Sequence, residues 1–223
     1  MCGRFALFST KWVIGEEFEV VELEELIPRY NVAPGQDVAV VMLSDGVRTV
    51  ENLRWGLVPH WAKDPTMGSR MINARAETLE EKPSFRDAFV NRRCLIVADG
   101  FYEWRKAGIR SPVYFSMSDG KPFGMAGLWE SWAPPDGDEL RTCTIITAEP
   151  NEIVRGVHDR MPAIIPRDHR SQWLDPTADN ETVRSMLGPY TAGETQSCDV
   201  SKLVNDLRND DEDLIKPVAE RLF

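Results

Sequence analysis

Five strand-like segments follow one another in the middle of this 223-residue chain, and no helical pattern separates them. Each segment is short and rich in apolar, β-branched or aromatic residues, which is the usual composition of strands. Parallel neighbours would need crossover connections of about a dozen residues, so closely spaced strands favour antiparallel pairing. The chain therefore lacks an alternating βαβ order. The predicted strands span 94–98, 101–105, 113–117, 123–129 and 141–147.

Further strands and helices are predicted on both sides of this block. A Ser-Asp-Gly turn signal at 44–46 joins predicted strands at 37–43 and 47–55. The amphipathic segment 11–27 predicts helix, in one or two pieces, ending before Pro28. Helical spacing recurs at 84–93, 150–156, 168–174 and 180–187, whereas 56–77 is irregular.

Together these elements predict a single α+β domain over residues 1–223, with a largely antiparallel, β-barrel-like core flanked by helices. Hydrophobic residues make up 42% of the chain, which suffices for one sizeable core. Residues 209–223 are assigned to an acidic loop and C-terminal tail, in which 209–213 (NDDED) is expected to be solvated.

The net charge of −10 argues against a nucleic acid partner, because phosphate binding needs basic side chains. The distribution of the charge weakens that argument. Residues 1–110 hold 15 Lys and Arg against 16 Asp and Glu, whereas residues 111–223 hold 11 against 20. The acidity belongs to the second half, so a local basic site in the first half is compatible with the composition.

No apolar run reaches the roughly 20 residues of a membrane span, and no signal-peptide pattern opens the chain. We therefore expect a cytoplasmic protein that is not bound to a membrane. Its four cysteines, Cys2, Cys94, Cys143 and Cys198, show no CxxC or CxH spacing. That spacing argues against a zinc site and, in a reducing compartment, against disulfides. No metal and no other cofactor is predicted.

Cys2 directly follows the initiator methionine. Because its side chain is small, we expect Met1 to be removed, which would leave an α-amine and a thiol on one residue. Such an aminothiol condenses with an aldehyde through the amine, and the thiol then closes a stable thiazolidine ring. The α-amine has a pKa of about 7.7–8.0 and the thiol about 8.5, so modest tuning activates both near neutral pH. The alternative is that Cys2 carries no chemistry.

Three polar residues lie in stretches that otherwise look structural: Asn73 in INARAET, Glu103 in ADGFYEW and His158 in VHDRMP. Each also has a structural interpretation, as a turn or cap, a solvent-facing strand residue and a hydrogen-bonded histidine respectively. Together with an N-terminal amine and thiol they form a set for imine chemistry. Loss of water from a carbinolamine needs a general acid, and the amine needs a base to lose its proton.

The chain resembles the SRAP family, the SOS response-associated peptidases, understood as abasic-site processing proteins. The resemblance rests on seven motifs in the family's order: MCGRF, RYNVAPGQ, WGLVPHWAKDP, MINARAET, CLIVADGFYEW, ITAEPN and HDRMP. It continues through VSKLVNDLRNDDEDLIKPV and fades in the last five residues. It implies a protein of the DNA damage (SOS) response that binds single-stranded DNA, or single-strand/double-strand junctions, carrying an abasic site. It also implies an α+β fold with a β-barrel-like core.

The resemblance further implies residue roles. Cys2 would capture the aldehyde of the ring-opened deoxyribose as a thiazolidine DNA–protein crosslink, which shields the lesion. Asn73 would hold the α-amine or the opened sugar, Glu103 would act as acid and base for the amine and imine, and His158 would protonate the sugar oxygen and assist reversal. The implied DNA-binding residues are Arg4, Arg75 and Arg160 at flanking phosphates, Asn31 and Pro34 shaping the pocket beside Cys2, Thr147 lining it, and Trp104 stacking on or wedging against a base.

Two other functions stay open at this point. A cysteine peptidase built on Cys2 and His158 would cleave a peptide in trans, or act only on its own N-terminus. A non-catalytic DNA-binding module would lose only affinity on Cys2→Ala. A retained Met1 would leave Cys2 without a free amine and so prevent thiazolidine formation. We expect a monomer that associates with the nucleoid when it is bound to DNA.

Overall fold

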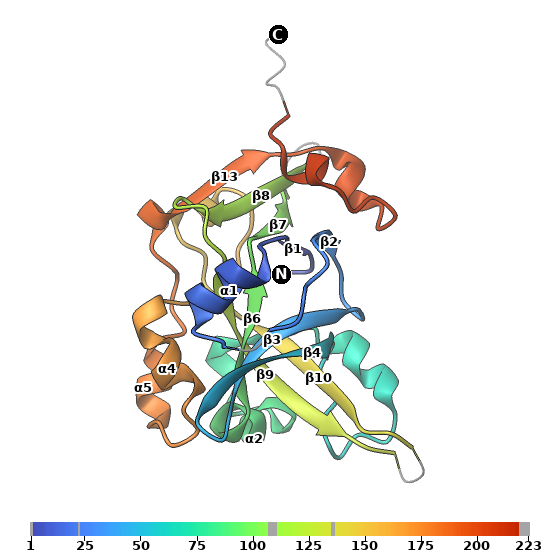
Figure 1. Ribbon diagram of the computed structural model, residues 1–223, viewed down its shortest axis with the longest axis vertical. Helices are drawn as coiled ribbons and strands as arrows, with labels where there is room; N and C mark the ends of the chain where they lie inside the picture. The colour runs from blue at the N-terminus through green and yellow to red at the C-terminus, as the bar shows by residue number, and fades with distance from the viewer. Residues whose placement is uncertain (1, 22, 107–110, 135–136, 219–223) are drawn as a thin grey trace.

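A closed five-stranded β-barrel lies at the centre of the protein (Figure 1). The computed structural model describes residues 2–21, 23–106, 111–134 and 137–218. Around the barrel the strands pair in the order β10, β4, β3, β6, β9 and back to β10, and only the short β4–β10 pair is parallel. These strands are β3 (Asp37–Ser44), β4 (Val47–Trp55), β6 (Arg93–Ala98), β9 (Phe123–Trp132) and β10 (Leu140–Ala148).

The β3–β4 hairpin follows directly from its turn sequence. Asp45 and Gly46 adopt φ values of 49° and 78°, the left-handed conformation at both central positions that a tight two-residue hairpin requires. The strands then pair without interruption from Asp37 opposite Arg54 to Ser44 opposite Val47. The predicted strands at 37–43 and 47–55 and the turn between them are confirmed.

Helices cover the outer side of the barrel at β6, all six residues of which are buried. Helix α2 (Pro83–Asn91) buries Phe85, Ala88 and Phe89, which recur at the three- and four-residue spacing of one helix face. Helix α4 (Arg170–Leu174) also packs on β6 and buries Trp173, whose indole N–H donates to the Cys94 carbonyl at 2.9 Å. This packing explains why β6 is apolar on both faces.

A second sheet lies at one end of the barrel, in the order β13, β8, β7, β1, β2 (Figure 1). Asp99 ties it to the barrel where the chain passes from β6 to β7, because its buried carboxylate accepts the backbone N–H groups of Phe8 and Ser9 at 2.6 and 2.7 Å. The strands are β1 (Phe5–Leu7), β2 (Arg29–Val32), β7 (Gly100–Trp104), β8 (Pro112–Met117) and β13 (Thr195–Asp199).

Short elements complete the described chain. The α-helices are α1 (Lys11–Phe18), α3 (Glu152–Arg155) and α5 (Asn180–Ser185), and the short strands are β5 (Asn73–Arg75), β11 (Met161–Pro162) and β12 (Ile164–Ile165). The 3-10 helices are η1 (Pro65–Arg70), η2 (Ala76–Thr78), η3 (Arg167–His169), η4 (Ala192–Glu194), η5 (Lys202–Asn205) and η6 (Glu212–Ile215).

The α+β class with a barrel core is confirmed, and so are the five central strands, with boundary shifts of up to three residues. The helix predicted over 11–27 is wrong beyond Phe18. Glu19 adopts a left-handed φ of 57°, and the Val20 N–H closes on the Gly15 carbonyl at 3.0 Å, which ends the helix. Val20 then lies buried in the larger hydrophobic cluster of the protein, whereas Val21 and Ile27 are exposed.

The acidic segment 209–213 is solvated only in part. The Asp210 carboxylate accepts hydrogen bonds from Arg29 Nε and from the backbone N–H groups of Tyr30 and Asn31 at 2.5–2.8 Å. The Asp211 carboxylate caps η6 through the Asp213 N–H. Local composition predicts charge and exposure, but the Asp210 carboxylate anchors the segment to β2 and the Asp211 carboxylate caps η6.

Candidate active site

Cys2 lies where three strands from distant parts of the sequence meet. Strand β1 pairs antiparallel with β7, and the Tyr102 N–H donates to the Arg4 carbonyl at 2.9 Å. The residues before β1 therefore run beside the end of β7, where Glu103 lies. From the other side, Asn73 on β5 donates through its side-chain amide to the Cys2 carbonyl at 2.8 Å. The Cys2 backbone is thus fixed by a strand on one side and by an amide on the other.

Glu103 and His158 form a close pair beside Cys2. The Glu103 Oε2 and His158 Nε2 atoms lie 3.8 Å apart, and both side chains are largely shielded from solvent. At the other ring nitrogen of His158, Nδ1 accepts the Arg160 N–H at 3.1 Å and lies 3.1 Å from Asp159 Oδ1. When Nδ1 accepts, the neutral imidazole carries its proton on Nε2, which faces Glu103. This arrangement allows proton exchange between the two side chains.

Burial shifts the pKa values of Cys2, Glu103 and His158. Burial, and next the Glu103 charge, raise the pKa of the Cys2 thiol far above its ordinary value. Burial raises the pKa of the Glu103 carboxyl and lowers the pKa of the His158 imidazole. Two pKa values that move towards each other are typical of acid–base pairs in active sites. The resting thiol is therefore uncharged and has to lose its proton during reaction.

A cavity of about 850 Å³ opens beside this pair. Four of its side chains are cationic, against one carboxylate, so the site is basic although the whole chain is acidic. Two of the cations are partly neutralised, because Arg105 pairs with Asp199 at 3.0 Å and Lys106 pairs with Asp159 at 2.8 Å. The cavity is lined by Gly3, Arg4, Glu103, Trp104, Arg105, Lys106, His158, Lys202 and Asn205.

Three further predicted residues lie next to Asn73. Arg75 follows Asn73 by two positions on β5, so both side chains point to the same face, and Arg75 is exposed. Thr147 is the partner of Arg75 on β10 and is buried. The Arg160 guanidinium donates to the Thr147 carbonyl and forms two hydrogen bonds with the Glu77 carboxylate at 2.6 and 3.0 Å. Arg160 is therefore already paired with a carboxylate in the described protein.

Asn31 and Pro34 do not line this cavity. The Asn31 amide is buried and donates to the carbonyls of Val204, Asp206 and Asn209 at 3.3, 3.1 and 2.6 Å. These hydrogen bonds attach the C-terminal segment, residues 204–209, to β2. Pro34 lines a second cavity, of about 520 Å³.

The sequence prediction missed one wall of the cavity beside Glu103 and His158. Lys202 and Asn205 come from η5, and Arg105 and Lys106 follow β7. Both Lys202 and Asn205 lie in VSKLVNDLRND, a segment that takes part in the family resemblance, so that segment could have indicated them.

Within the described ranges no cluster of three His, Cys, Asp or Glu side chains could hold a metal ion. No helix among those residues is long and apolar enough to cross a membrane.

Comparison with known proteins places these motifs in one family. Residues 1–207 match the family described as SOS response associated peptidase (SRAP). The chain is 44% identical over 222 residues to abasic site processing protein YoqW of Bacillus subtilis (strain 168), covering 97% of this chain and 99% of that protein. It is 30% identical over 227 residues to abasic site processing protein YedK of Escherichia coli (strain K12), covering 98% and 100%.

The fold of the chain also agrees with that of a solved protein structure. A crystal structure of a protein from Bacteroides thetaiotaomicron superposes with a TM-score of 0.86 at 26% identity, over 98% of this chain and 100% of that one. Both the sequence match and the superposition extend over nearly the full length, so they include every strand that holds a site residue. The chain therefore belongs to the SOS response associated peptidase (SRAP) family.

Proposed function

We propose that this protein captures abasic sites in single-stranded DNA as a covalent crosslink through Cys2, and thereby shields the lesion. The observation that carries the proposal is the fixed start of the chain. The Cys2 carbonyl is held by Asn73, and the neighbouring Gly3 and Arg4 line a basic cavity that also contains Glu103 and His158. The named relatives are abasic site processing proteins, and the proposal extends that activity to this chain.

The chemistry balances with groups that the site supplies. The α-amine of Cys2 adds to the aldehyde carbon of the opened sugar to give a carbinolamine, which loses water to give an imine. The thiol sulfur then adds to the same carbon, and the thiol proton ends on the former imine nitrogen. The product is a thiazolidine, and the only by-product is water. Because amine and thiol belong to one residue, the second step is intramolecular, with effective concentrations of up to ~10⁵–10⁸ M in well-oriented systems.

The ionisation of the pair supports separate roles. Burial raises the pKa of Glu103, so its carboxylate is a stronger base than usual and can accept a proton from the amine or the thiol. The protonated carboxyl can return that proton as water leaves. His158 is assigned to the sugar oxygen, where its imidazolium promotes opening of the closed deoxyribose ring. In the reverse direction the imidazolium is assigned to protonate the thiazolidine as the crosslink is released. Asn73 keeps the Cys2 backbone in place while these protons move.

DNA would cross the cavity beside Cys2. Arg4 and Arg75 supply cations for the flanking phosphates, Trp104 supplies a surface for a base, and Thr147 lines the neighbouring wall. Arg160 would contact a phosphate only if its hydrogen bonds to the Glu77 carboxylate loosen. We keep Asn31 and Pro34 as supports of this surface, although each lies outside the cavity.

The mechanism requires a free amine on Cys2 and therefore removal of Met1, a residue outside those that the structure describes. Cleavage before Cys2 is the only proteolysis the proposal needs. We further propose that the protein acts as a monomer in the cytoplasm and lies on the nucleoid when crosslinked. Single-strand/double-strand junctions are included among the substrates, because capture needs only an unpaired abasic nucleotide.

The test is a denaturing gel of the protein with a labelled single-stranded oligonucleotide that carries one abasic site. A heat-resistant band of slow mobility is expected for the unmodified protein and for Cys94→Ala, whose thiol is buried in β6. No band is expected for Cys2→Ala, or for an oligonucleotide with a tetrahydrofuran analogue, which has no aldehyde. A band from Cys2→Ala would refute the assignment. Cleavage of an added peptide by the unmodified protein would favour the peptidase instead.

A further inference from the structure

One wall of the cavity that contains Glu103 and His158 is made by η5, which contributes Lys202 and Asn205. None of the roles above uses either side chain. This wall comes from a part of the chain about 200 residues away from Arg4, yet it touches the same cavity.

The wall is firmly attached to the rest of the molecule. Val204, between the two lining residues, is completely buried in the second hydrophobic cluster. Its carbonyl accepts hydrogen bonds from Arg4 Nη1 at 2.6 Å and Asn31 Nδ2 at 3.3 Å. Farther along, the Asp210 carboxylate binds the backbone of β2. Lys202 and Asn205 therefore project from a rigid support, and a ligand that meets them loses little affinity to ordering of the segment.

The Asn205 amide has a defined orientation. The Trp104 indole N–H lies 2.8 Å from Asn205 Oδ1, and because that N–H can only donate, the amide oxygen must face it. The amide NH₂ group then points away from the indole, and it makes no hydrogen bond to any residue that the structure describes. The Arg4 guanidinium lies 5.8 Å from the centroid of the Trp104 ring. Trp104 is thus held by two contacts before any ligand arrives.

Lys202 differs from the other lysine of the cavity. Lys106 is paired with Asp159 at 2.8 Å, whereas the exposed Lys202 forms no ion pair within the described ranges. A phosphate that binds Lys202 therefore displaces only water and counterions, and no existing ion pair has to break.

We propose that η5 is a DNA-contacting element, in which Lys202 binds a backbone phosphate and Asn205 both orients Trp104 and donates its NH₂ group to an acceptor on the same DNA strand. The inference rests on the proposed function and deepens it. The two residues should leave different signatures. Removing a phosphate contact lowers the salt dependence of binding, whereas removing a neutral hydrogen bond lowers affinity at every salt concentration alike.

The experiment measures the affinity for a single strand carrying the tetrahydrofuran analogue, from 50 to 200 mM salt, because this DNA binds without crosslinking. Lys202→Gln is expected to reduce the slope of log affinity against log salt by about 0.7. Asn205→Ala is expected to weaken binding about fivefold to tenfold with an unchanged slope. Asn205→Asp keeps an oxygen for Trp104 but loses the NH₂ donors, and it should bind more weakly still. Lys202 and Asn205 are exposed, so unchanged melting temperatures serve as the check on folding.

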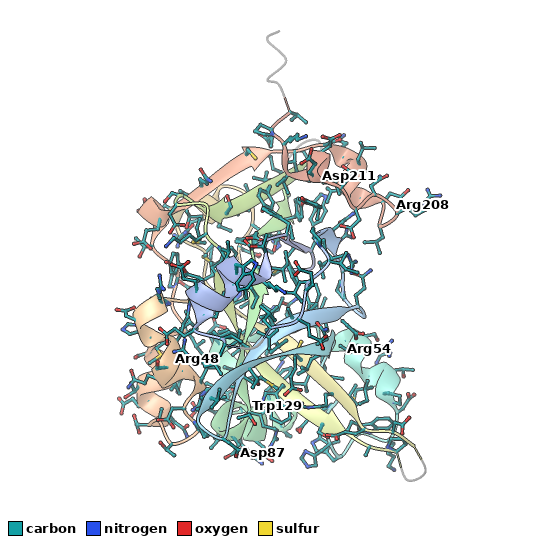
Figure 2. All side chains as sticks on the ribbon, in the orientation of Figure 1. Arg48, Arg54, Asp87, Trp129, Arg208 and Asp211 are labelled. Atoms are coloured by element: carbon teal, nitrogen blue, oxygen red, sulfur yellow. The ribbon has the colours of Figure 1, made fainter. Side chains whose placement is uncertain are left out.

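Arg208→Gln is the matched control. Arg208 belongs to the same segment, pairs with Asp206 and projects from the outer edge of the molecule (Figure 2). Its loss removes one positive charge outside the cavity, and the slope should stay within error of the unmodified protein. Wild-type affinity and slope in Lys202→Gln and Asn205→Ala, with abasic DNA still crosslinked, would overturn this inference and leave the proposed function intact. Absence of both DNA binding and crosslinking by the unmodified protein would overturn both.

Discussion

Replacing His158 by Gln tests the acid–base assignment most directly, and crosslink release is the reaction to follow. In release the α-amine nitrogen is part of the thiazolidine in both the unmodified protein and the variant, so the difference between their pH profiles reports the imidazole. Glutamine retains an oxygen that can accept the Arg160 N–H, which His158 accepts at 3.1 Å. The variant should therefore fold, although its amide has no proton to transfer between pH 5 and 8.

The magnitude follows from the direction of the pKa shift. Burial lowers the pKa of His158 below its ordinary value of 6.5, so less than about a quarter of the molecules carry the imidazolium at pH 7. If the imidazolium is the acid, the release rate must rise as the pH falls through this depressed pKa. Between pH 7.0 and 5.5 the rise should be about fourfold or more, and it approaches about thirtyfold for a strongly depressed pKa. Loss of the acid should slow release by ~10²–10⁴-fold.

The assay starts from purified crosslink on labelled DNA, with an excess of unlabelled abasic DNA to capture the released protein. The fraction of free labelled strand is followed on denaturing gels from pH 5.0 to 7.5. A release rate in the unmodified protein that does not change over this range would refute the reasoning. So would a His158→Gln variant that keeps the same rate and the same pH dependence.

Further predictions concern other residues. Intact mass spectrometry of crosslinking-competent protein should show the loss of Met1, and a preparation that retains all of Met1 yet still crosslinks contradicts the thiazolidine mechanism. Cys2→Ser should give little heat-resistant adduct, because oxygen closes a less stable ring, while Cys94→Ala keeps the adduct; the reverse pattern on the gel would identify the wrong thiol. Asn31→Ala removes three amide hydrogen bonds to the C-terminal segment and should lower the free energy of unfolding by about 1–3 kcal/mol in urea titrations. An unchanged unfolding free energy would show that the segment is held by other contacts.

Local patterns predicted the long barrel strands well, because alternation or continuous apolarity over six or more residues leaves little ambiguity. The short strands were not predictable in this way. Strand β5 has three residues and forms through its pairing with β10, and β1 also has three residues. Helix α1 ends at Phe18 because burial of Val20 directs the chain inward, although the charged sequence that follows has helical spacing. Tertiary contacts decided these cases.

At the site, the motifs identified Cys2, Asn73, Glu103 and His158 as one set, and the structure brings them together. The partners of these residues could not be read from the motifs. Arg160 carries no sign in the sequence that its guanidinium is bonded to Glu77. Asn31 lies in a motif with the expected DNA-binding residues, yet its amide is used to bind backbone carbonyls of the C-terminal segment. Which partner each side chain binds depends on its orientation and on contacts between residues far apart in the sequence, and a local motif contains neither.

The hydrogen bond from Arg4 to the Val204 carbonyl joins residues 200 positions apart, and this separation has a consequence for synthesis. Every barrel strand has been synthesised once the ribosome has translated β10, which ends at Ala148. The anchor at Asp210 follows 62 residues later, the difference between 210 and 148. At about 5–20 residues per second this interval lasts roughly 3–12 s. During it a nascent chain can hold Cys2 against Asn73 but lacks the η5 wall, so the proposed DNA surface is completed after the proposed nucleophile is in place.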